Sequence, residues 1–87
     1  MPYLSEEVAL LDGLIGQYFT SPRLSETLRE DYLTVHRHIA TGALTRKDYQ
    51  RIRSAVDFLL PLHKSSPSDY KLLVGVLTKT TSMLAAH

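Results

Sequence analysis

The chain has 87 residues, of which 44% are hydrophobic and 22% charged, with four glycines and four prolines. A chain near this length forms one domain and buries only about 60–65% of the surface that its unfolded form exposes. The composition is that of an ordinary globular domain and excludes a disordered or low-complexity chain. There is no cysteine, which excludes disulfides and thiolate chemistry and makes a reducing cytoplasm the expected location.

Charge is unevenly distributed, although the net charge is only +1. Residues 1–31 hold six acidic and two basic side chains, net −4, whereas residues 32–64 hold six basic and two acidic ones, net +4. We expect acidic and basic helices to lie side by side; a polarised surface for a charged partner is the alternative. The N-terminal segment carries no basic residue and no apolar run approaches the ~20 residues that span a bilayer, so we expect no signal peptide and no membrane contact.

Four stretches repeat apolar residues at spacings of three and four, and none alternates as a strand does, so the sequence predicts an all-α fold. We expect a single helical domain over residues 1–87. It should be a compact four-helix bundle with a central antiparallel hairpin made by its second and third helices. The predicted helices cover about residues 5–19, 22–41, 45–60 and 67–85.

The first predicted helix begins at Ser5, a residue type that caps helix N-termini. Its apolar face, widened by Leu10 and Leu14, covers about half of the circumference. Gly13 and Gly16 lie within the same helix, and we expect them to admit another helix closely on the side opposite this face.

The second predicted helix has two candidate starts, Ser21, which precedes a proline, and Ser25. Gly42 suits the left-handed residue that follows a helix end. The apolar residues form one narrow stripe. Leu33 falls off this stripe, beside Arg37.

The third predicted helix begins at Thr45, which forms a capping box with Asp48, and Pro61 should end or bend it. Its apolar stripe is also narrow. The fourth begins at Ser66 and Pro67 and is apolar over more than half of its circumference. We expect the first and fourth helices to supply most of the core. Because so small a bundle cannot easily hide both, a partner should cover the excess.

The segment LTRKDYQRIR, residues 44–53, raises the question of nucleic-acid binding. On a helical wheel its four basic residues fall at two opposite edges of the polar arc. Asp48 and Asp57 lie three and four residues from Arg51 and Arg53, so we expect local surface pairs. A helix-turn-helix alignment would place Asp48 at a core position, which argues against that motif. The nucleic-acid alternative uses Arg37, Arg46, Lys47, Arg51 and Arg53.

Phe58 falls inside the polar arc of the third helix, near basic residues, and aromatic residues framed by arginine are enriched in interface cores. We therefore expect a small cytoplasmic protein-interaction or regulatory module that binds an unidentified protein partner and self-associates, as a dimer, through its first or fourth helix. The predicted partner-binding residues are Phe58, Leu33, Arg37, Lys47, Arg51, Leu72, Val76 and Met83.

Catalytic and metal-binding patterns are absent from the sequence. His36 and His38 lie two residues apart, which on a helix points them to different sides, and no other ligands stand at helical spacing. We interpret His36 as a half-buried histidine. The serines lie where helix capping accounts for them, and the glycines form no phosphate loop. We expect no enzyme activity, no metal and no cofactor.

Overall fold

The computed structural model describes residues 2–86, and in that range the chain forms helices and no strand. The helices are α1 (Ser5–Tyr18), α2 (Glu26–Thr41), α3 (Arg46–Leu59) and α4 (Pro67–Ala85), with a short 3₁₀ helix η1 (Leu60–His63) between the last two. The all-α, four-helix bundle prediction is confirmed.

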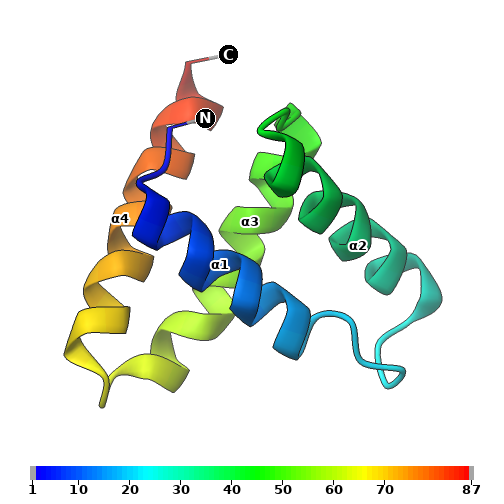
Figure 1. The fold of residues 1–87 in the computed structure, drawn as a ribbon, viewed down its shortest axis with the longest axis horizontal. Helices are drawn as coiled ribbons and strands as arrows, with labels where there is room; N and C mark the ends of the chain where they lie inside the picture. The colour runs from blue at the N-terminus through cyan, green and yellow to red at the C-terminus, as the bar shows by residue number, and fades with distance from the viewer. Residues whose placement is uncertain (1, 87) are drawn as a thin grey trace.

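Helix α3 lies at the centre of the chain's packing, with α4 against one side and α2 against the other, while α1 runs across and contacts α2 and α4 (Figure 1). The bundle is flat, with principal extents of 32 × 31 × 20 Å. Each α-helix thus packs against two others, and the narrow apolar stripe of α3 is buried between its neighbours.

Helix α2 begins at Glu26, so the predicted start at residue 22 is wrong and the alternative start is correct. Ser25 is the N-cap, and its hydroxyl accepts a hydrogen bond from the Leu28 amide at 3.2 Å. Ser21 accepts instead from the amide of Arg23 at 3.2 Å, which organises the loop before the helix. At the other end Gly42 has φ 75°, the left-handed conformation predicted for it.

The capping box at the start of α3 is present. The Thr45 hydroxyl accepts from the Asp48 amide at 3.3 Å, and Asp48 Oδ2 accepts from the Thr45 amide at 2.8 Å. Pro61 lies in η1, directly after α3 ends at Leu59, as predicted. Ser66 is the N-cap residue of α4, but its side chain makes no capping bond.

The predicted Ser5 cap of α1 is wrong, because the N-cap residue is Leu4. Glu7 satisfies the start of the helix instead, since its Oε1 accepts from the Leu4 amide at 2.7 Å. Gly13 and Gly16 were expected to admit a neighbouring helix, but no atom lies within 4 Å of a Cβ placed on either. Both are exposed.

The core is built around α3 and not, as expected, around α1 and α4. The reason is geometric: α3 and α4 each pack against two other α-helices, and a narrow stripe fits entirely between two neighbours, whereas a wide stripe extends beyond them. Helix α1 contributes three buried apolar residues and α4 two. Those of α3 are Tyr49, Ile52, Ala55, Val56 and Leu59.

Candidate interaction surface

Phe58, in the last turn of α3, is 53% exposed although it touches other aromatic rings. Its ring centroid lies 5.7 Å from that of Phe19 and 6.3 Å from that of Tyr18, both in edge-on geometry. Phe19 in turn lies 4.3 Å from the buried ring of Tyr32. The exposed ring is therefore the outer member of an aromatic cluster that continues into the core.

Leu62, in η1, is 51% exposed and follows Phe58 by about one helical turn, because the backbone stays helical through Leu60. We call Tyr18, Phe19, Phe58 and Leu62 the aromatic patch. Burying a large apolar side chain completely is worth about 1.5–3 kcal/mol. A partner that covered Phe58 and Leu62 would therefore gain a substantial part of its binding free energy there.

Tyr32 fixes the inner end of this cluster. Its hydroxyl donates to the Arg51 carbonyl at 3.3 Å, which joins α2 to α3 below the aromatic patch. Burial raises the pKa of Tyr32, against the lowering effect of the nearby Arg51 guanidinium. The phenol thus stays neutral and holds the rings in place at ordinary pH.

Two basic residues on the same side of α3 share one acidic partner on α2. Asp31 lies 2.7 Å from the Arg51 guanidinium and 3.5 Å from the Lys47 ammonium. The expected pairs within α3, between Arg51 and Asp48 and between Arg53 and the aspartate four residues later, do not form. The expectation that acidic and basic helices lie side by side is confirmed at this contact.

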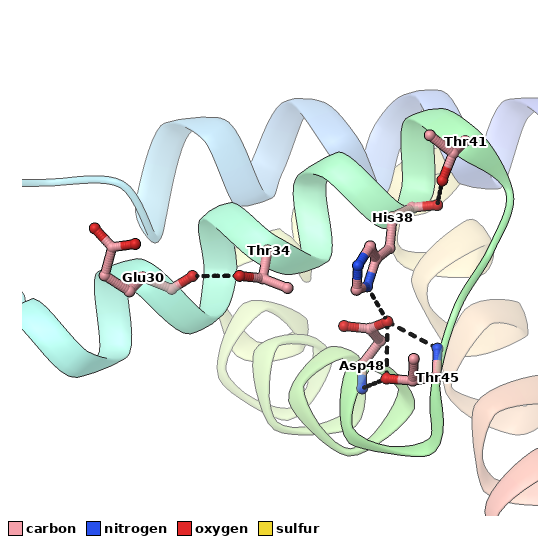
Figure 2. Close-up of polar contacts among 6 residues, drawn as sticks. All are labelled: Glu30, Thr34, His38, Thr41, Thr45 and Asp48. Atoms are coloured by element: carbon pink, nitrogen blue, oxygen red, sulfur yellow. Dashed lines mark hydrogen bonds and ion pairs between the residues drawn. The ribbon is translucent and has the colours of Figure 1, made fainter.

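Asp48 is unavailable to Arg51 because it is buried, 3% exposed, at the turn between α2 and α3. Figure 2 shows its Oδ2 receiving three contacts: the Thr45 amide at 2.8 Å, the Thr45 hydroxyl at 3.0 Å and His38 Nδ1 at 2.6 Å. The carboxylate thus caps α3 and fastens α2 to it.

The hydroxyls around His38 are already committed to the backbone. In Figure 2 the Thr34 hydroxyl donates to the Glu30 carbonyl at 3.0 Å, and the Thr41 hydroxyl donates to the His38 carbonyl at 3.2 Å. Both threonine bonds lie within α2. The His38–Asp48 contact is therefore the one in this group that joins α2 to α3.

His36 points to the other side of α2, as the spacing of the two histidines predicted. Its Nδ1 lies 2.5 Å from Asp12 Oδ1 on α1, and the two atoms are shielded from solvent and have no hydrogen-bond partner of ideal geometry. The side chain is half-exposed. The two histidines therefore connect α2 to two different helices.

The predicted partner-binding residues do not gather in one place. Val76 is buried against the core and is unavailable to a partner. Leu72 and Met83, also on α4, are half-buried, as is Leu33 on α2, whereas Arg37 is exposed. Phe58 is the member that protrudes most among the apolar ones.

Tyr18 and Phe19 were not among the predicted site residues, because their spacing assigned them to the core face of the first helix. The signal that could have identified them is their position. They occupy the last residue and the C-cap of α1, where an apolar face runs past its neighbours.

The basic residues of α3 line two adjoining hollows of about 510 and 450 Å³ that share Arg46, Gln50 and Ser54. Arg46 donates to the Leu84 carbonyl at 3.0 Å, near the C-terminal end of α4. The first hollow also contains Arg53 and Asp57, and the second contains Lys47 and Arg51. Arg37, on α2, lines neither.

Within residues 2–86, no three histidine, aspartate or glutamate side chains come together as a metal site requires. No helix of that part of the chain combines the length and the apolar character needed to cross a bilayer. A scan against protein-family models, a search of curated proteins and a search of solved structures found no match to this chain.

Proposed function

We propose that this chain is a small, non-catalytic protein-interaction module that self-associates as a dimer through the aromatic patch. The single observation that carries the proposal is the 53% exposure of Phe58 as the outer ring of an aromatic cluster, with Leu62, 51% exposed, one helical turn further along the chain. A cytoplasmic location remains an expectation from the cysteine-free sequence.

A second copy is the simplest occupant, because a two-fold axis through the aromatic patch would place each Phe58 against the apolar surface of the other chain. Interface cores are depleted of charge and enriched in aromatic residues, and the patch has that composition. The Asp31, Lys47 and Arg51 group lies on the same side of α3 and would supply a polar rim. As a rim of charged side chains, it would influence orientation and association rate more than affinity.

Sedimentation equilibrium over a range of about 1 to 300 µM tests the proposal. We expect dimerisation in the wild-type chain and a dissociation constant at least about tenfold larger for Phe58→Glu, because a carboxylate at the patch centre loses its hydration on association. Val74→Glu is the matched control, since Val74 is exposed on α4 and outside the patch. A monomeric wild-type chain throughout this range, or equal effects of the two substitutions, would contradict the proposal.

A second candidate function is binding of nucleic acid along α3, which the two adjoining hollows lined by Arg46, Lys47, Arg51 and Arg53 favour. The carboxylates of Asp31 and Asp57 reduce the local positive charge. If phosphates bind there, affinity for a single-stranded oligonucleotide must fall steeply as salt rises, and Arg53→Glu must weaken it more than Arg23→Glu, at an exposed residue of the α1–α2 loop. Salt-independent binding would exclude this function.

A further inference from the structure

Glu7 is a buried carboxylate between α1 and α4 that keeps unused acceptor capacity. Its Oε1 accepts from the Leu4 amide at 2.7 Å and from the Lys79 ammonium at 2.6 Å. Its Oε2 receives no hydrogen bond from residues 2–86. A carboxylate offers about four lone-pair sites, so the Oε2 side of Glu7 remains available.

A glycine makes room for this oxygen. Gly75 of α4 lies against Glu7, and a Cβ added there would collide with Oε2. Any other residue at this position would force the carboxylate or the helix to move. Gly75 thus leaves room for the Glu7 carboxylate, and the two residues line the same open space.

That open space is a hollow of about 510 Å³ lined by both helices. Leu4, which is 55% exposed, and the half-buried Leu72 supply its apolar lining, and Glu7 and Gly75 also line it. The exposed ammonium of Lys71 is a further lining group. A buried carboxylate beside accessible apolar side chains is complementary to a cation carried on an aliphatic stem.

We propose that this hollow receives an arginine or lysine side chain of a partner protein. The stem would pack between Leu4 and Leu72, and the cationic head would donate to Glu7 Oε2 in a charge-assisted hydrogen bond. The exposed carboxylate of Glu6 also lines the hollow and adds attraction for a cation. Lys79 is already engaged by Oε1, and it balances Glu7 before binding.

This site shares no residue with the aromatic patch, so it neither requires nor excludes dimerisation there. The two surfaces can fail separately. If a second copy of the chain supplied the cation instead, dimerisation in the sedimentation experiment would depend on Glu7.

Three capped peptides test the proposal: acetyl-Leu-Arg-Leu-amide, acetyl-Leu-Lys-Leu-amide and the neutral acetyl-Leu-citrulline-Leu-amide. Each is titrated into the ¹⁵N-labelled full chain while the amide signals of Glu6, Leu72 and Gly75 are followed. We expect saturable shifts with at least one cationic peptide and at least about tenfold weaker binding of the citrulline peptide. The stronger of the two cationic peptides identifies the preferred head group.

Two variants localise the binding. Glu7→Gln should weaken the cationic peptide at least about tenfold, because it removes the charge at nearly constant shape. If that variant fails to fold, Leu4→Ala remains usable, since Leu4 is exposed; it should weaken binding by about threefold through the lost apolar wall. Val74→Ala, on another side of α4, is the control and should change nothing.

Two results would overturn the proposal. One is the absence of saturable shifts at these amides up to about 10 mM peptide, a concentration above the weakest affinity of interest. The other is equal affinity for the cationic and citrulline peptides, which would make the hollow a purely apolar contact.

Discussion

Helices α3 and α4 differ in the width of their apolar stripes, and the helix with the narrower stripe has more buried apolar residues. Helix α3 has a narrow stripe, yet Ile52, Val56 and Leu59 are fully buried. Helix α4 is apolar around much of its circumference, yet only Leu73 and Val76 of its apolar residues are fully buried. Both helices pack against two other α-helices, so the width of the apolar stripe decides how much of it the neighbours can cover.

The bundle covers more of its terminal helices than their apolar patterns predict. The structure buries Leu14 and Val76 and covers Leu10, Leu72 and Met83 in part. The excess on α4 is therefore small. Phe58, at the end of α3, is instead strongly exposed and belongs to an aromatic cluster.

The largest expected effect is at the centre of α3. Ile52→Ala removes a side chain that is completely buried and should lower the free energy of unfolding by about 3–4 kcal/mol. Urea denaturation followed by circular dichroism measures it. A loss below about 1 kcal/mol would show that α3 is not the centre of the core.

The buried cap of α3 should rank second. Asp48→Ala removes the acceptor for Thr45 and leaves His38 without its partner, so we expect a loss of about 2 kcal/mol. Asp57→Ala, at an exposed residue of the same helix, is the control and should change stability by less than about 0.5 kcal/mol. Equal losses in the two variants would remove the capping role.

The contact between Tyr3 and α4 should rank third and should depend on pH. The Thr80 hydroxyl donates its hydrogen bond to the Val76 carbonyl at 2.6 Å. The Tyr3 hydroxyl must therefore be the donor to Thr80, also at 2.6 Å. Burial raises the pKa of Tyr3 from 10.0 to about 12. Because the raised pKa belongs to the folded state, this stabilisation is complete below pH 10 and is lost as pH rises toward 12.

Tyr3→Phe tests this assignment. At pH 7 the variant should be less stable by about 1 kcal/mol, the net value of one hydrogen bond. Between pH 10 and 12 its stability should fall less steeply than that of the wild-type chain. Parallel pH profiles in urea melts would show that the Tyr3 phenol does not titrate as described.

An effect as small as that of Tyr3→Phe should come from the edge of α4. Leu72→Ala removes a side chain that is only half-buried, so the loss should be about 1 kcal/mol, well below that of Ile52→Ala. A loss equal to that of Ile52→Ala would show that Leu72 contributes as much to the core as Ile52 does. Thermal or urea unfolding of the two variants side by side makes this comparison.

Much of the secondary structure was predictable because its causes are local. The Thr45–Asp48 box, the left-handed Gly42 and the break at Pro61 each depend on residues within one helical turn. Errors arose where two local solutions compete, as at Ser21 and Ser25. They also arose where the acceptor came from an unexpected side chain, as when Glu7 accepts from the Leu4 amide at the start of α1 in place of a Ser5 cap.

The candidate surface was predictable only in part. The wheel placed Phe58 outside the stripe of its helix, and it is indeed exposed. It gave no means of knowing that Tyr18 and Phe19 lie beside it, because those rings come from a helix about 40 residues away in sequence. The pairing of Arg51 with Asp31 was not predicted for the same reason. Asp48, three residues before Arg51 in the same helix, was expected to be its partner.

By itself, the sequence determined that this chain is helical, where most of its helices begin and end, and which side chains share a face. Those properties follow from contacts between residues up to four apart. Only the tertiary structure decided which apolar faces are covered, which carboxylate meets which base, and that Gly75 gives Glu7 its place beside an open hollow. Burial and charge pairing depend on where one helix lies against another, and that arrangement is set by the packing of all four helices together.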